Sequence, residues 1–226
     1  MTLAPCAIVF GYGGFGEAGL AAVERAGCRV ARVFTHADAP DEDCWWRSMA
    51  ARAAAVGVPV ELDADLRAAA VQARIAAAAP AFLFSFFYRQ LIPNAVLGLA
   101  TRGAYNFHSS LLPRFRGRAP LNWQLVHGAD AAGLTLHRMA IGADAGGIVA
   151  QQRVPIGPDD DAKALFDRLL DRLHPFLDDA LAALRDGRAV ETAQAHADAT
   201  AFPGRRPGDG RIRWELPARR IHDLVR

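Results

Sequence analysis

The sequence predicts an α/β fold in which a mostly parallel sheet carries helices on both faces. Short apolar runs alternate with helical patterns through the first half of the chain, and glycine or proline bounds most of these runs. A glycine cluster follows the first run, as in the β–α turns of such sheets. Buried parallel strands have this continuous apolar character because helices cover both sides of them. The predicted arrangement is Rossmann-like, with a short C-terminal extension.

The first half of the chain supplies the parallel strands and the helices between them. Strands are expected at Ala7–Phe10, Val30–Thr35, Val58–Val60 and Phe82–Phe86, which are short and rich in β-branched or aromatic residues. Helices are expected at Glu17–Arg25, Trp45–Val56 and Leu66–Ala78, where apolar residues recur at helical spacing.

The second half changes rhythm after Gly103. A strand at Ala104–His108 leads into a Pro- and Arg-rich loop, Pro113–Pro120, and then a helix through Trp123 and Val126. Two further strands are expected at Gly133–Met139 and Gly147–Ile156, followed by a long helix at Asp160–Gly187. In the tail, a loop is expected at Pro203–Gly210, the start of a strand at Ile212–Trp214 and a helix at Ala218–Arg226. The second of the two strands is expected to pair antiparallel at the sheet edge.

Composition excludes several classes of protein. The chain has 26 basic and 24 acidic residues, a balance too even for a dedicated nucleic-acid binder. Its most apolar stretch, Ile75–Phe87, contains Pro80 and falls short of the ~18 residues of a membrane span. The three cysteines show no metal-site spacing, so no metal is expected. No secretory leader pattern opens the sequence, which predicts a cytoplasmic protein.

The glycine cluster Gly11–Gly16 fits the pattern G-x-G-x-x-G between a strand and a helix. One interpretation is a dinucleotide site, where glycines let the backbone approach a pyrophosphate. That site also needs an acidic residue at the end of the second strand, where this chain has Phe34–His36. The alternative is a glycine-rich turn that binds no ligand, and the sequence leaves both open.

Three other features carry the residue types of group-transfer chemistry. Asn106 and His108 lie on the same side of a predicted strand end, where an amide and an imidazole suit an oxyanion donor and a general acid/base. The loop after them carries arginines, which bind phosphates or carboxylates. Asp144, in a glycine-rich loop, is expected to reach a histidine, favour its charged form and raise its pKa. Each feature also has a purely structural interpretation.

The order and spacing of these features identify a resemblance. Asn106–His108, Ser110–Pro113, Arg116–Gly117 and Asp144–Gly146 resemble the signature of the formyltransferase family that uses 10-formyltetrahydrofolate. The resemblance runs from Ala7 to the last residue. It implies a formyltransferase catalytic domain over residues 1–202, with residues 203–226 as a linker and the start of a truncated or missing C-terminal subdomain.

Within the family, Phe84–Arg89, Arg116–Trp123 and Thr135–Met139 are similar to the formyltransferase domains of bifunctional polymyxin-resistance enzymes. The resemblance therefore implies formylation of UDP-4-amino-4-deoxy-L-arabinose, a step of lipid A modification. Another nucleotide-linked amino sugar, or methionyl-tRNA, is an alternative acceptor. A non-catalytic nucleotide-binding module built on the glycine cluster is the alternative from another class.

The resemblance also implies roles for individual residues. Catalysis would fall to Asn106, His108 and Asp144. The residues expected to bind 10-formyltetrahydrofolate are Gln90, Leu91, Ile92, Arg118, Ala140, Ile141, Gly142 and Ala143. Those expected at the acceptor are Arg118, Asn122 and Tyr12. The expected partners are thus two small molecules, a folate and a UDP-amino sugar, with no nucleic acid and no membrane insertion, and the oligomeric state stays open.

Overall fold

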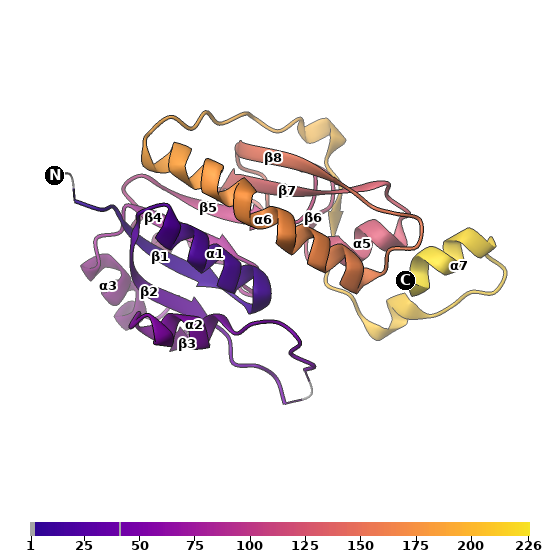
Figure 1. Ribbon diagram of the computed structural model, residues 1–226, viewed down its shortest axis with the longest axis horizontal. Helices are drawn as coiled ribbons and strands as arrows, with labels where there is room; N and C mark the ends of the chain where they lie inside the picture. Colours follow the sequence, from indigo (N-terminus) through magenta and orange to yellow (C-terminus); the bar gives the residue numbers. More distant parts are fainter. Residues whose placement is uncertain (1–2, 41) are drawn as a thin grey trace. The chain divides into compact units, whose positions relative to one another are not determined.

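The computed structural model describes residues 3–40 and 42–226, which form two compact units (Figure 1). Unit 1 comprises the described residues up to Phe107 together with His174–Val190. Unit 2 comprises His108–Leu173 and Glu191–Arg226. No helix among the described residues has the length and apolar character needed to cross a membrane.

Unit 1 is built on a parallel sheet with strand order β3-β2-β1-β4-β5. The strands are β1 (Cys6–Gly11), β2 (Arg29–Thr35), β3 (Val60–Leu62), β4 (Phe82–Phe86) and β5 (Gly103–His108). All residues of β1 and β4 are buried, as expected for central strands of a covered sheet. The mostly parallel sheet that the sequence predicts is therefore confirmed.

Helices cover this sheet. They are α1 (Gly13–Arg25), α2 (Met49–Ala55), α3 (Ala69–Ala77) and α4 (Asn94–Leu97). Helix α1 packs on β1, β4 and α2, whereas α3 packs against α4. In Figure 1, α1 lies in front of the strands of unit 1, and the fainter α3 lies on their more distant side.

Aromatic side chains fill much of the core of unit 1. Phe10 stacks on Phe34 of the neighbouring strand, with ring centroids 4.9 Å apart. Phe15 of α1 stacks on Phe107, at 5.5 Å. Such pairs add to the stabilisation that burial of their large apolar surfaces provides.

Unit 2 contains an antiparallel pair, β7 (Ala131–Arg138) with β8 (Ile148–Pro155), which confirms the predicted antiparallel strand. Two short strands, β6 (Arg116–Gly117) and β9 (Ala201–Phe202), pair in parallel. Its helical segments are α5 (Pro120–Val126), α7 (Ala218–Val225), two 3₁₀ turns at His196–Asp198 and Pro207–Gly210, and the first half of α6 (Ala162–Arg185). Helix α6 confirms the long predicted helix and ends in unit 1, before Gly187.

Several predicted boundaries of the first half are corrected. Helix α1 begins at Gly13, not Glu17, because the Gly16 N–H donates to the Tyr12 carbonyl and closes the first turn within the glycine cluster. Helix α2 begins at Met49, not Trp45, because the Ser48 hydroxyl caps it by accepting the Ala51 N–H.

Two strand predictions are also corrected. The third strand covers Val60–Leu62 rather than Val58–Val60, since Pro59 has no N–H to give to a ladder. Ile212–Trp214 do not start a strand. Trp214 is 78% exposed, and the Leu216 N–H donates to the Arg213 carbonyl to form a turn.

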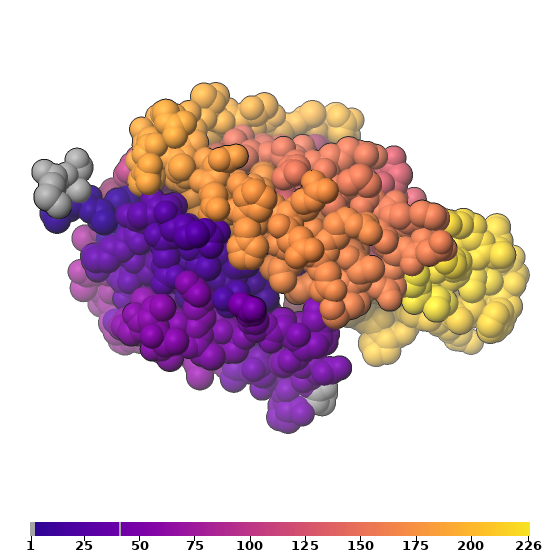
Figure 2. Space-filling model, in the orientation of Figure 1, coloured from indigo at the N-terminus to yellow at the C-terminus, as the bar shows by residue number. Residues whose placement is uncertain are grey.

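The C-terminal extension packs within unit 2, of which it is a part. In Figure 2, its yellow surface lies against the orange surface formed by the residues that lead into α6. Arg226 is almost fully buried there; it pairs with Asp223 at 2.9 Å and donates to the Gly157 carbonyl at 3.0 Å. A buried arginine with a carboxylate and a carbonyl partner fixes the end of α7.

Gly19 gives a test of the packing in unit 1. A Cβ placed on Gly19 would lie 2.3 Å from the ring of Phe86, a fully buried side chain of a central strand. We expect Gly19→Ala to lower the free energy of unfolding by about 1–3 kcal/mol, measured as a lower urea midpoint. In the control Gly98→Ala, the new Cβ would meet only the Asn94 carbonyl, at 3.5 Å. Equal midpoints for the two variants would contradict this packing.

Candidate active site

The end of strand β5 carries the first two predicted catalytic residues. Asn106 is half-buried, and His108 is 5% exposed. Phe107 between them packs its ring on Phe15 and Phe87, with centroids 5.5 and 6.0 Å away. Because strand residues alternate, Asn106 and His108 share the opposite side of β5. The alternation predicted from the sequence is therefore present.

His108 has one ring nitrogen fixed by the backbone. Its Nε2 lies 2.7 Å from the carbonyl oxygen of Phe115, which only accepts, so Nε2 carries a hydrogen. The other nitrogen, Nδ1, lies 3.6 Å from a carboxylate oxygen of Asp144. That distance exceeds a hydrogen bond, which fits a neutral ring whose lone pair is on Nδ1.

Asp144 sits in the loop between β7 and β8 in a left-handed conformation, with φ of 52°. Aspartate tolerates this region better than most residues. Its Oδ2 accepts the N–H of Gly117 at 2.8 Å, and its Oδ1 lies 3.4 Å from Nε2 of His137. One backbone donor and two imidazoles, those of His108 and His137, thus surround the carboxylate.

Gln194 holds the loop that carries Asp144. Its side-chain N–H₂ donates to the carbonyls of Asp144 and Gly146, both at 2.7 Å. Its carbonyl oxygen accepts from Nε of Arg116 at 3.1 Å. A buried glutamine with all these partners fixes the backbone of the loop relative to β6, and β6 supplies the Gly117 donor.

The pKa values of this group depend on burial and on nearby charge. Burial raises the pKa of Asp144, but His108, His137 and the Gly117 N–H outweigh it, so the pKa lies well below its ordinary 3.8. Burial lowers the pKa of His108 below its ordinary 6.5, and Asp144 and the Phe115 carbonyl oppose this effect only in part. Asp144 lies beside a histidine and acts to raise its pKa, as predicted, but burial outweighs this effect, so the net shift in the pKa of His108 is downward.

The sign of these shifts sets the response to acid. The pKa of His108 is lower in the folded chain than in the unfolded chain, so as the pH falls the unfolded chain takes up this proton at a higher pH. Stability from His108 is therefore lost below about pH 6.5. The low pKa of Asp144 adds a second loss below its ordinary value of 3.8.

His137 is a site residue that sequence reasoning missed. It lies on β7, and its Nδ1 is 2.9 Å from the carbonyl of Arg138, which leaves Nε2 facing Asp144. The alternation of β7 places Thr135 on the same side as His137, and the Thr135 hydroxyl donates to the Ser110 carbonyl. The sequence signal that could have identified His137 is its place in a predicted strand, two residues from a threonine and so on the same side of the strand.

A family model described as formyl transferase matches residues 7–181 of this chain. The chain belongs to the formyl transferase family. Asn106, His108, His137 and Asp144 all lie within the matched region of this formyltransferase.

Solved structures share the fold. WlaRD, a sugar 3-N-formyltransferase crystallised in the presence of dTDP and 5-N-formyl-THF, is 17% identical with a TM-score of 0.77, over 100% of this chain and 79% of that one. An N-formyltransferase from Helicobacter canadensis, in complex with folinic acid and dTDP-3-aminofucose, is 18% identical with a TM-score of 0.76. The match covers 97% of this chain and 79% of that one. Glycinamide ribonucleotide transformylase 1 from Symbiobacterium toebii is 24% identical with a TM-score of 0.71, and the match covers 86% of this chain and 96% of that one.

The residues expected at the folate lie on exposed loops of the formyltransferase. Gln90–Ile92 follow β4 in unit 1, and Leu91 is 84% exposed. Ala140–Ala143 precede Asp144 in unit 2, and Ile141 is 85% exposed. Apolar side chains at such exposure offer contact surface to a ligand. Their roles remain predictions.

The residues expected at the acceptor differ in their surroundings. Arg118 has an exposed side chain, while its backbone N–H donates to the Phe202 carbonyl. Asn122 is exposed on α5. Tyr12 is 7% exposed, and its hydroxyl lies 2.6 Å from Asp38 and 2.8 Å from Glu42. Burial and these carboxylates raise the pKa of Tyr12, which keeps the phenol protonated.

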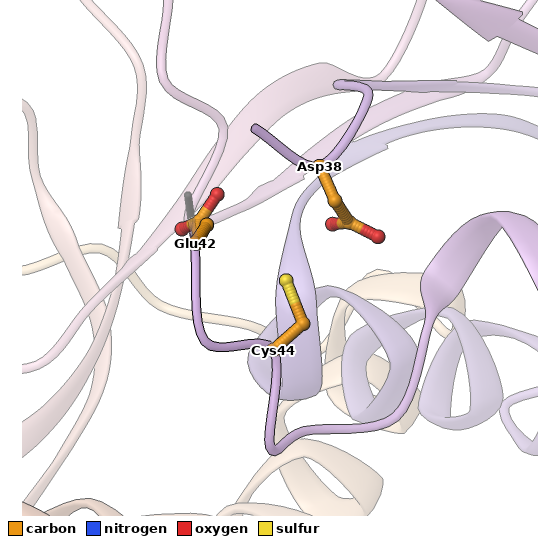
Figure 3. A group of neighbouring side chains, drawn as sticks. All are labelled: Asp38, Glu42 and Cys44. Carbon is orange, nitrogen blue, oxygen red and sulfur yellow. The ribbon is translucent and has the colours of Figure 1, made fainter. Parts of the chain in front are cut away.

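Asp38, Glu42 and Cys44 form a small group around that phenol, and Figure 3 shows the three side chains on one loop of unit 1. Their ligand atoms lie within 4.8 Å of one another. Glu42 also pairs with Arg89, whose guanidinium lies 3.9 Å from the centroid of the Tyr12 ring. These contacts connect Asp38 and Glu42 to Tyr12 of the glycine cluster.

The coupling between Asp144 and His108 gives a test. Asp144→Asn removes the negative charge that opposes the effect of burial on His108. We therefore expect this variant to lower the pKa of His108 further, as measured by NMR titration of its imidazole signals. The control Asp179→Asn changes an exposed carboxylate on α6 and should leave His108 as it is. A raised or unchanged pKa in Asp144→Asn would refute the coupling.

Proposed function

We propose that this formyltransferase transfers the formyl group of 10-formyltetrahydrofolate to the amine of a nucleotide-linked amino sugar. The observation that carries the proposal is the buried Asp144 carboxylate facing Nδ1 of His108, next to a strand end that also bears Asn106. The neighbours named as sugar N-formyltransferases support it, because both were crystallised with a formylated folate and with dTDP or a dTDP-amino sugar.

Proton transfer falls to His108. The attacking amine must lose a proton, and the lone pair on Nδ1 of the neutral ring accepts it. The proton then rests between the imidazole and the carboxylate of Asp144, 3.6 Å away, which stabilises the imidazolium formed. Burial keeps the ring neutral before the reaction, and the carboxylate makes the charged state accessible during it.

Asn106 stabilises the other charge. When the amine attacks the formyl carbon, the formyl oxygen becomes negative, and the side-chain amide donates a hydrogen bond to it. Collapse of the tetrahedral intermediate breaks the bond to the folate nitrogen, which takes the proton from His108. The products are the formamide and tetrahydrofolate, and the enzyme returns to its starting protonation.

For the acceptor, we propose UDP-4-amino-4-deoxy-L-arabinose, which would assign the enzyme to lipid A modification in the cytoplasm and to polymyxin resistance. The support is the similarity of Phe84–Arg89, Arg116–Trp123 and Thr135–Met139 to the enzymes that use this sugar. The acceptor bound to the Helicobacter canadensis enzyme is instead a dTDP-linked 3-amino sugar. The acceptors to be tested should therefore differ in the position of the amine on the sugar and in the nucleotide base.

The test is incubation of the purified chain with 10-formyltetrahydrofolate and UDP-4-amino-4-deoxy-L-arabinose, dTDP-3-aminofucose or glycinamide ribonucleotide. We expect a mass gain of one formyl group on a sugar nucleotide and the fastest turnover with the UDP sugar. Formylation of a dTDP sugar alone would overturn the acceptor but keep the enzyme class. Formylation of glycinamide ribonucleotide alone would overturn the proposed function.

A further inference from the structure

Unit 2 contains a pocket of about 640 Å³, which is within the range of small-molecule sites. Its wall combines the N-terminal end of α6, the exposed side of α5, the turn at Arg205–Gly210 and the end of the chain. The lining residues used below are Asn122, Asp161, Lys163, Arg205, Arg206 and Arg226. None of the catalytic residues described above lines it.

The lining is strongly basic. Lys163, Arg205, Arg206 and Arg226 line the pocket beside one carboxylate, Asp161. Asp167 pairs with Lys163 at 2.5 Å and Asp223 pairs with Arg226 at 2.9 Å, so Arg205 and Arg206 supply most of the attraction for an anion. The whole chain has a net charge of only +2. This concentration of charge in a concave wall favours an anionic ligand, because low-dielectric walls strengthen the attraction.

The first turn of α6 adds to this potential. The helix spans Ala162–Arg185, and Ala162 and Lys163 line the pocket. The positive end of the helix dipole therefore lies at the pocket. Asp161 accepts the N–H of Ala164 at 2.7 Å, so the carboxylate serves as a helix cap.

The basic side chains belong to a segment with its own fixed structure. Arg205 stacks over the indole of Trp123, 5.0 Å from its centroid, and the indole N–H donates to the Pro203 carbonyl at 2.7 Å. The backbone N–H of Arg206 donates to Asp209 at 2.7 Å. A turn held in this way loses little conformational entropy when it binds a ligand.

The position of the pocket along the chain connects it to the catalytic group. Asn122 lines the pocket, and Gly117, five residues earlier, donates its N–H to Asp144. Five residues span at most about 18 Å, which is the order of length of a sugar nucleotide. One ligand can therefore contact the pocket with its phosphates and approach Asp144 with its sugar.

We propose that this pocket binds the diphosphate of the nucleotide-linked sugar, with Arg206 as a principal contact. The inference rests on the proposed function, since it assigns the phosphates of the proposed acceptor. Guanidinium groups bind phosphate oxygens through paired hydrogen bonds, and the guanidinium groups of Arg205 and Arg206 match the two phosphates of a diphosphate. A pocket of this volume suits a small diphosphate better than an extended nucleic-acid backbone.

The experiment is calorimetric titration of the full chain with UDP, dTDP and inorganic pyrophosphate. We expect Arg206→Gln to weaken UDP binding by about tenfold or more, the loss of a hydrogen bond to a charged group. Lys163→Gln, on α6, should weaken it independently. The matched control is Arg211→Gln, which removes the same charge from an exposed arginine that does not line the pocket. In the formyl-transfer assay, Arg206→Gln should raise KM and leave kcat within about twofold.

The outcomes separate the two proposals. UDP binding that is equal in wild type, Arg206→Gln and Lys163→Gln would overturn the pocket assignment even where sugar formylation is observed. UDP binding that depends on both residues, in an enzyme that formylates no sugar nucleotide, would support the pocket and overturn the proposed function. Unchanged UDP binding with weakened tRNA binding in Arg206→Gln would assign the pocket to a nucleic acid and overturn it as a diphosphate site.

Discussion

The structure of the candidate active site depends on one buried carboxylate. Removing a charge from water costs several kcal/mol, so Asp144 is stable there only because the Gly117 N–H donates to it and the imidazoles of His108 and His137 lie beside it. Gly117, His108 and His137 come from three separate segments, and Gln194 ties the loop to a fourth. The demand of this charge for partners therefore fixes the relative positions of the β5 end, β6, β7 and the loop after β7.

The same contacts give His108 two opposed influences. Burial favours the neutral ring, whereas the carboxylate and the Phe115 carbonyl favour the charged one. A base of this kind is neutral before the reaction and is stabilised when it takes a proton, which is the behaviour that transfer from an amine requires. Sequence spacing indicated that Asp144 would reach a histidine, but only the burial of the ring reveals the sign of the pKa shift.

Much of the fold was predictable because its signals are local. The buried strand Phe82–Phe86 and the amphipathic helix α6 follow from apolar periodicity alone. The errors arise where the outcome depends on distant partners: Ile212–Trp214 has strand-forming residues but lies in a loop and turn, and β6 and β9 are two-residue strands without a sequence pattern. His137 and Gln194 were missed for the same reason, since only tertiary structure brings them to Asp144.

The most direct test of the account is the pH dependence of kcat/KM for formyl transfer in the wild type and in Asp144→Asn. The account predicts a loss of rate on the acid side below pH 6.5, where His108 gains its proton, and a shift of that limb to lower pH in the variant. Titration of the substrate amine would give a limb at the same pH in both proteins. An acid limb that Asp144→Asn does not move would contradict the claim that His108, coupled to Asp144, is the base.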